Sequence, residues 1–103
     1  MKKYRILPQT QEDFFNAHEY LYERSPSAAE SFAKLMFDAF ELLGDFPALG
    51  HVRKDLTDKP FRFWPAGNYL IIYRPDLNPV PIVALIHGSQ DVGQLLQQSQ
   101  DEE

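Results

Sequence analysis

The chain has 103 residues, no cysteine and a net charge of −5, with 10 Lys and Arg against 15 Asp and Glu. A single domain of this length can bury a core without disulfides, and the absence of thiols excludes disulfides and thiolate metal sites. No apolar run is long enough to cross a bilayer and no signal-peptide core is present, so we expect a soluble, cytoplasmic protein with no membrane partner.

The N-terminal part begins with a strand pattern and continues as a helix. Residues 3–8 alternate in the manner of a short strand, which Pro8 ends. Residues 10–24 place apolar side chains at helical spacing, with Thr10 as the expected N-cap and Asp13 as a weak form of the capping box. We therefore expect one strand followed by an amphipathic helix.

A second helix follows after a very short connection. Ser25 is a good N-cap and Pro26 a good first helical residue, whereas Gly44 and Pro47 mark the expected end. The apolar stripe between them is wide and contains Ala28, Ala29, Phe32, Leu35, Met36, Ala39, Phe40, Leu42 and Leu43. Two helices joined so closely form an antiparallel hairpin, and its apolar face needs a partner.

Three strand patterns make up the C-terminal part, at residues 61–64, 68–74 and 80–88. They are rich in β-branched and aromatic residues and are separated by turn formers, which indicates an antiparallel meander. The middle run has no polar residue between its ends, so we expect a central strand. Alternation would place Tyr69, Ile71 and Tyr73 on one face of the middle strand, and Val80, Ile82, Ala84 and Ile86 on one face of the last strand.

These patterns predict an α+β fold with two layers. A helical hairpin would pack on an antiparallel sheet of about four strands, in the order β-α-α-β-β-β, and the first strand would return to pair with the meander. We expect one domain over residues 1–92. Residues 93–103 would form a short acidic tail, with one or two helical turns at residues 93–98.

Charge is distributed unevenly along the chain. The segment after Gly88 contains four acidic residues and no basic one, which leaves a net charge of −1 on the body. The loop region between His51 and Arg62 is locally basic and holds Arg53, Lys54, Lys59 and Arg62 against Asp55 and Asp58. Because phosphate binding depends on Lys and Arg, the overall acidity argues against direct sequence-specific DNA binding.

Four short motifs carry a family resemblance. They are Phe46-Pro47-Ala48-Leu49-Gly50, Phe61-Arg62-Phe63-Trp64, Asn68-Tyr69-Leu70-Ile71-Ile72-Tyr73-Arg74 and Ile86-His87-Gly88-Ser89-Gln90-Asp91. In this order, from Tyr4 to about Val92, the chain resembles the RelE/ParE superfamily of type II toxin-antitoxin toxins. It looks most similar to the ParE branch, the plasmid stabilisation proteins.

This resemblance implies a small toxin that a cognate antitoxin neutralises with an extended or helical segment. ParE-like members are inhibitors of DNA gyrase, whereas RelE-like members cut messenger RNA in the ribosomal A site, and one fold serves both functions. We expect a ParE-like toxin that acts by binding and needs no cofactor. The alternatives are a ribosome-dependent endoribonuclease and a degenerate, non-toxic member kept as an interaction module.

The candidate target-binding residues are Arg53, Lys54, Arg62, Arg74 and His87. In an endoribonuclease, His87 would be the general acid or base, and Arg62, Arg74 and Lys54 would bind the phosphate. Each residue also has an ordinary structural interpretation. His87 would bond to backbone at a strand end, the two arginines would be edge cations or partners of Asp and Glu on the helices, and Lys54 would belong to a solvated loop.

The sequence also departs from the family pattern and lacks other motifs. Ser89-Gln90-Asp91 stands where ParE-like chains commonly have Ala-Arg-Asp, so one charge that could matter for target binding is missing. His18, His51 and His87 are too scattered for a metal site, and neither a glycine-rich phosphate loop nor a serine nucleophile motif is present.

Overall fold

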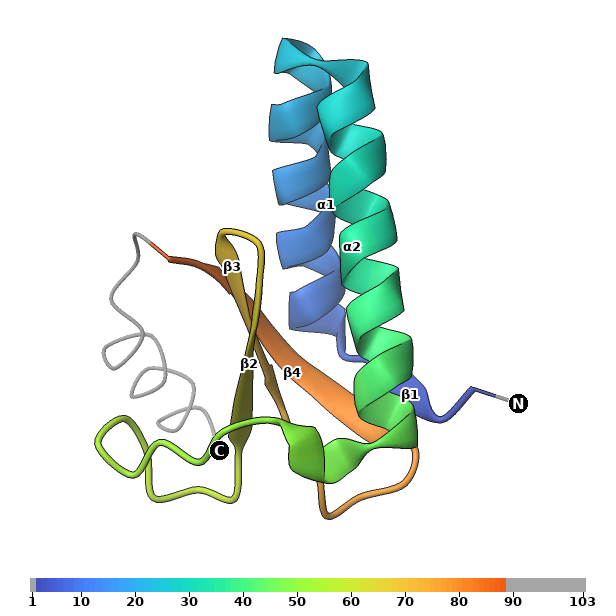
Figure 1. Cartoon of the computed structure of the whole chain (residues 1–103). Helices are drawn as coiled ribbons and strands as arrows, with labels where there is room; N and C mark the ends of the chain where they lie inside the picture. Colours follow the sequence, from blue (N-terminus) through green and yellow to red (C-terminus); the bar gives the residue numbers. More distant parts are fainter. Residues whose placement is uncertain (1, 89–103) are drawn as a thin grey trace.

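The computed structural model describes residues 2–88 (Figure 1). The elements are β1 (Tyr4–Ile6), α1 (Pro8–Arg24), α2 (Pro26–Asp45), the 3-10 turn η1 (Pro47–Leu49), β2 (Arg62–Ala66), β3 (Tyr69–Tyr73) and β4 (Val80–His87). The predicted element order and α+β class are confirmed. The expected tail at residues 93–103 lies outside the described residues. Within residues 2–88, no helix is both long and apolar enough to cross a membrane.

The sheet has four strands in the order β1-β4-β3-β2, so β3 is central to the meander as its composition predicts. The strands β2, β3 and β4 pair antiparallel. The first strand does return to the meander, and it pairs with β4 in the parallel direction, with Tyr4 opposite Val80. The sheet is therefore mixed and not wholly antiparallel as expected, because β1 and β4 run in the same direction and are joined through the helices rather than through a tight turn.

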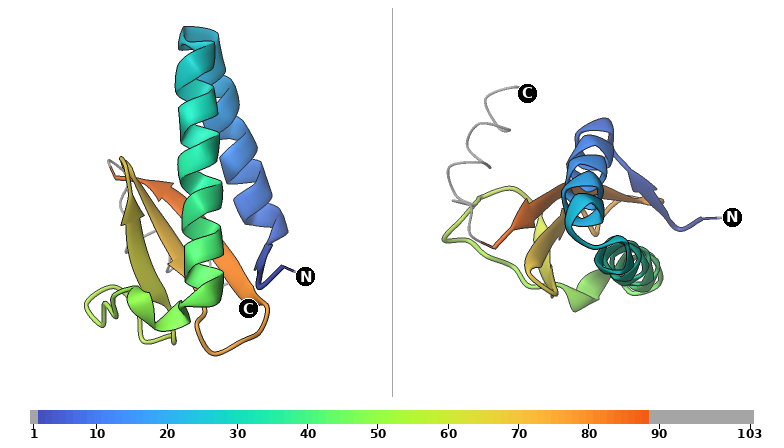
Figure 2. Two further views of the ribbon diagram at one scale, coloured as in Figure 1. Left: turned by 45° about the vertical axis from the view of Figure 1, so that its right-hand side comes forward. Right: turned by 90° about the horizontal axis from the view of Figure 1, so that it is seen from above.

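The two helices form the predicted hairpin and cover one face of the sheet, while the end near Ser25 projects beyond it (Figures 1 and 2). Ser25 caps α2 as expected, since its side chain accepts a hydrogen bond of 3.3 Å from the backbone nitrogen of Ala28. The main core lies between these layers. Its fully buried members include Met36, Phe40, Leu43, Ile71, Tyr73 and Ile82.

A second, smaller apolar cluster lies on the opposite face of the sheet. It consists of Phe61, Phe63, Ile72 and Ile86, with Leu56 of the preceding loop packed against it. The central strand thus has both faces covered, with Ile71 in the main core and Ile72 in the smaller cluster.

One predicted helix boundary is wrong. The helix α1 begins at Pro8 with Leu7 as N-cap, and Thr10 does not cap it. Thr10 is instead fully buried and donates a hydrogen bond of 2.9 Å to the carbonyl of Ile82, which ties α1 to β4. The helix α2 ends at Asp45, between Gly44 and Pro47 as expected, and Gly44 lies close to the backbone of Lys3.

The expected alternation along the last strand is also wrong. The register between β3 and β4 shifts at Ile72 and Tyr73, where Ile72 pairs with Ala84 and Tyr73 with Ile82. The extra residue, Val83, forms a bulge. After the bulge, the residues that would have faced the helices face the other side of the sheet, and the reverse. Val80, Ile82 and Leu85 therefore join the main core, whereas Ile86 belongs to the cluster on the opposite face.

Candidate functional site

Arg62, the first residue of β2, is held in a hydrogen-bond network beside the turn that follows α2. Its guanidinium donates a bond of 2.8 Å to the carbonyl of Gly50. The hydroxyl of Tyr73, directly opposite Arg62 in the sheet, accepts a bond from the Gly50 nitrogen and donates one to the carbonyl of Pro47, both at 2.7 Å. The network joins the end of α2 to the β2–β3 pair.

Gly50 is required where the turn meets the tyrosine ring. A β-carbon at this position would lie 2.7 Å from Cε1 and 2.9 Å from Cζ of Tyr73, closer than van der Waals contact allows. Burial raises the pKa of Tyr73, although the hydrogen bond from Gly50 and the charge of Arg62 act in the opposite direction. The hydroxyl therefore stays protonated and acts as a structural donor.

Two further candidate arginines form ion pairs with neighbouring aspartates. Arg74 binds both carboxylate oxygens of Asp76, at 3.2 and 2.6 Å. Arg53 does the same with Asp55, at 3.0 and 2.8 Å. The hydrogen bonds from the arginines lower the pKa of both Asp55 and Asp76, and the bond to Asp55 raises the pKa of Arg53. These pairs are largely exposed, so they contribute little to stability and can exchange for other partners.

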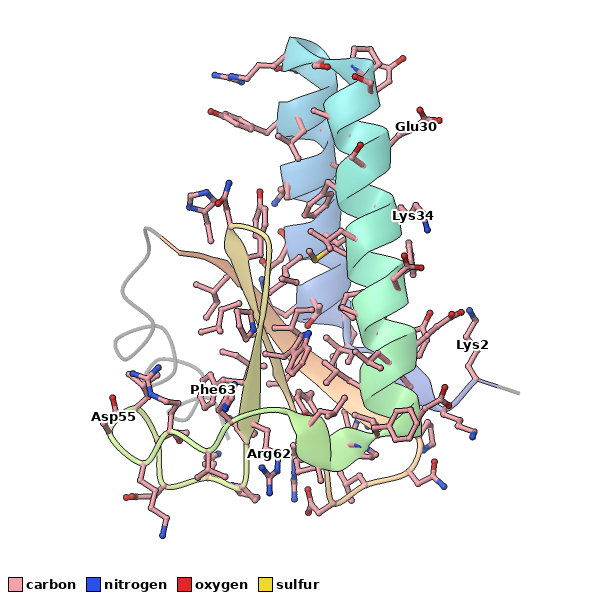
Figure 3. All side chains as sticks on the ribbon, viewed as in Figure 1. Lys2, Glu30, Lys34, Asp55, Arg62 and Phe63 are labelled. Atoms are coloured by element: carbon pink, nitrogen blue, oxygen red, sulfur yellow. The ribbon has the colours of Figure 1, made fainter. Side chains whose placement is uncertain are left out.

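Four of the five candidates lie at one end of the sheet or on the loop that leads to it. Arg62 begins β2 and Arg74 follows the last residue of β3, so antiparallel pairing brings them together. The loop that carries Arg53 and Lys54 leaves the same end, as the positions of Asp55 and Arg62 show (Figure 3). Lys54 is exposed and makes no ion pair or hydrogen bond with any residue in the described range 2–88. This basic end consists of Arg53, Lys54, Arg62 and Arg74.

His87 lies at the opposite end of the sheet. It pairs with Tyr69 at the start of β3, whereas Arg62 pairs with Tyr73 at its end. Four residues of strand separate these positions, which corresponds to about 13 Å at the usual rise per residue. The ring of His87 contacts that of Tyr69 edge-on, with centroids 5.2 Å apart. The structure therefore brings the arginines together and keeps His87 away from them.

An exposed apolar surface follows one side of α2. Leu35 and Leu42 lie on the same side of the helix, seven residues apart, and Phe46 and Leu49, which follow at the end of α2 and in η1, are exposed as well. Leu35 reaches the turn between β2 and β3 at Gly67. We call these four residues the α2–β2 margin. Its signal in the sequence was a stripe of apolar residues on α2 wider than one sheet face can cover.

The adjacent edge of β2 is poorly suited to pairing with another strand. Phe63 already exchanges both backbone hydrogen bonds with His51, each at 2.8 Å. Alternation directs the backbone of Pro65 to the same outer side, and proline has no N–H to donate. The ring of His51 also stacks on Trp64, with centroids 6.4 Å apart. A partner that approaches this side therefore meets side chains more readily than an open strand edge.

No metal site is present among residues 2–88. No group of three or more His, Asp or Glu side chains is placed to hold a metal ion. An open cleft of about 380 Å³ lies between Lys3, Pro47 and Leu77. Lys3 at its rim forms an ion pair with Asp45 at 3.3 Å. Charged, polar and apolar residues all line the cleft, and they do not form a catalytic group.

A comparison with protein families identifies one matching family model. It is described as the ParE toxin of type II toxin-antitoxin system, parDE, and it matches residues 4–92. The match includes every helix and strand described above. A search of curated proteins finds no match.

Proposed function

The chain belongs to the ParE toxin family of type II toxin-antitoxin systems, and we propose that it arrests growth by binding a protein target, DNA gyrase, rather than by cutting RNA. The basic end is the proposed contact with this target. A cognate antitoxin would neutralise the toxin by placing an amphipathic helix along the α2–β2 margin.

The separation of His87 from Arg62 and Arg74 is the observation that carries the choice of binding over catalysis. An endoribonuclease needs an acid or base and a cation around one phosphate, within hydrogen-bond reach of the reacting atoms. About 13 Å of β3 separates these groups. Arg62 also binds the carbonyl of Gly50, which removes one donor from any phosphate contact.

The apolar row on α2 supports the proposed mode of antitoxin binding. Exposed contiguous apolar surfaces on small soluble domains mark sites of protein contact. An amphipathic helix fits such a row through anchors at helical spacing, whereas addition of a strand needs an edge with available N–H groups. The pairing of Phe63 with His51 and the position of Pro65 oppose strand addition beside the margin.

The test is a supercoiling assay with purified gyrase and purified toxin, followed in cells by plasmid topology and primer extension on ribosome-bound messages. We expect supercoiling to be inhibited and messages to stay intact. Supercoiling that is unchanged at large molar excess, together with cleavage at codon boundaries, would establish the endoribonuclease instead. Normal growth on induction without antitoxin would identify a non-toxic member.

A further inference from the structure

The face of the helical hairpin that points away from the sheet carries a row of exposed aromatic side chains. Asp13 and Tyr20 mark the sheet-facing side of α1, since Asp13 lies near the backbone of Leu85 and Tyr20 near Tyr69. Phe15 and Tyr22 lie on the opposite side of the helix, about 140 to 180° away. They are 60% and 56% exposed.

Ring contacts link part of this row across both helices, through the half-buried Phe14 and His18. Tyr22 stacks with His18 and His18 with Phe14, with ring centroids 6.3 Å apart in each pair. Phe14 in turn contacts Phe37 of α2 at 5.3 Å, and Phe37 is 41% exposed. We define the outer aromatic row as Phe15, His18, Tyr22 and Phe37. None of these side chains belongs to the α2–β2 margin or to the basic end.

Glutamates border the outer aromatic row on both helices. Glu19 lies four residues after Phe15 and three before Tyr22, so it is next to both on the helix surface. Glu41 is placed in the same way after Phe37, and Glu30 points away from the sheet (Figure 3). The full border is Glu12, Glu19, Glu23, Glu30 and Glu41.

These five carboxylates make no ion pair with any other residue in the described part of the chain. The two basic residues of the hairpin form no ion pair with them. Lys34 pairs with Asp38 at 2.9 Å, and Arg24 stacks on Tyr20 at 3.8 Å from the ring centroid. The aromatic row therefore lies within a field of negative charge.

The outer aromatic row and the glutamates around it determine which kind of partner can bind. A partner needs an apolar stripe for the aromatic row and a basic rim for the glutamates. Nucleic acid does not fit, because its phosphates would face carboxylates. A two-fold dimer through this face does not fit either, because it would place the same five glutamates of two copies against each other.

We propose that the outer face of the helical hairpin is a second protein-binding surface, and that it takes a basic amphipathic helix from another protein. The site goes beyond the toxin function proposed above and lies on a different side of α2 from the α2–β2 margin. A bound helix there leaves the margin accessible, so the chain can hold two partners at once.

The test uses two synthetic helical peptides that share one leucine stripe but differ in the polar face, which carries lysines in one and glutamates in the other. Calorimetric titration of the full chain should detect binding of the lysine peptide, weakened by added salt, and none of the glutamate peptide. Amide chemical shifts should move within residues 12–41. Phe15→Ser and Glu19→Lys should each lower the affinity by roughly tenfold or more.

The matched controls are Phe46→Ser, whose side chain is also 60% exposed, and Asp58→Lys on the distant loop. Both should retain full affinity for the lysine peptide. Equal binding of the two peptides, or full affinity in Phe15→Ser, would overturn the proposal. A concentration-dependent dimer that Phe15→Ser abolishes in sedimentation would assign the face to a second copy and also overturn it. Tyr22→Ser replaces Phe15→Ser if circular dichroism shows that the latter is unfolded.

Discussion

The hydroxyl of Tyr73 accepts a hydrogen bond of 2.7 Å from the backbone nitrogen of Gly50, across 23 positions of sequence. The same hydroxyl donates to the carbonyl of Pro47, and Arg62 donates to the carbonyl of Gly50. A buried tyrosine and a neighbouring arginine thus fix the turn between the helical layer and β2. The basic end is built on this turn, so its geometry depends on the core.

Replacing Tyr73 with Phe tests this connection. The ring would stay in place, but the Gly50 nitrogen and the Pro47 carbonyl would lose their partner in a buried setting. We expect a loss of about 1 to 3 kcal/mol in the free energy of unfolding, measured by urea denaturation. Tyr69→Phe is the control, because no hydrogen bond of its hydroxyl to another described residue is present. Equal losses in both variants would contradict a specific role for the Tyr73 hydroxyl.

Gly50→Ala tests the close approach of the turn to the tyrosine ring. The backbone of Gly50, with φ of −67° and ψ of 168°, is allowed for alanine, so any cost comes from the added methyl group. Because that group would lie 2.7 Å from Cε1 of Tyr73, we expect a loss of about 1 to 3 kcal/mol on chemical denaturation. The double variant Gly50→Ala, Tyr73→Leu should lose less than the sum of its single changes. If the losses in the free energy of unfolding of the two single variants simply added in the double variant, the strain in Gly50→Ala would not come from contact with the ring of Tyr73.

Asp13 is a half-buried carboxylate on α1, and its replacement with Asn should stabilise the chain. Burial raises the pKa of Asp13, the hydrogen bond from Gln9 lowers it, and the charge of Glu12 raises it again. A raised folded pKa means that ionisation at neutral pH opposes folding. We expect Asp13→Asn to raise the midpoint of thermal unfolding at pH 7. The gain should shrink as pH falls through the folded pKa and vanish below the unfolded value of 3.8. Asp38→Asn, which only loses an exposed pair with Lys34, should show no such gain.

Sequence patterns predicted the elements of this fold because each follows from local chemistry. Helical spacing, the cap at Ser25 and the turn formers between strands do not depend on distant residues. Thr10 and the bulge at Val83 were missed because both depend on packing between α1, β3 and β4. The local sequence around a threonine is the same whether its hydroxyl caps a helix or, as in Thr10, donates a hydrogen bond to a strand of the sheet.

The site was harder to predict than the fold, for two different reasons. The separation of His87 from Arg62 and Arg74 follows from the antiparallel direction of neighbouring strands. It could have been predicted from the sequence by assigning a direction to each strand of the meander. The bond from Arg62 to Gly50 could not be read in the same way, because it depends on where the turn after α2 folds back. A charged residue at a strand end therefore has no assignable role until its tertiary neighbours are known.

The candidate target contacts should separate into three classes when tested singly. Arg62→Ala should lower stability as well as gyrase inhibition, because its guanidinium supports the Gly50 carbonyl. Arg74→Ala should lower inhibition with little change in the unfolding midpoint, because its pair with Asp76 is largely exposed. His87→Ala should leave inhibition unchanged, since it lies at the other end of the sheet. A variant His87→Ala that abolishes growth arrest while remaining folded would require a different target surface.

Phe46 and Phe15 offer a paired test of the two proposed binding faces, since both are 60% exposed but they lie on different sides of the hairpin. Phe46→Ser should weaken binding of the cognate antitoxin by roughly tenfold or more, because it removes an aromatic anchor from the α2–β2 margin. Phe15→Ser should leave antitoxin affinity unchanged and lower the affinity for the lysine peptide by roughly tenfold or more. Calorimetry with each ligand against both variants gives four affinities. If both substitutions weakened the antitoxin equally, its contact would extend over the outer aromatic row, and the two faces would form a single surface for one partner.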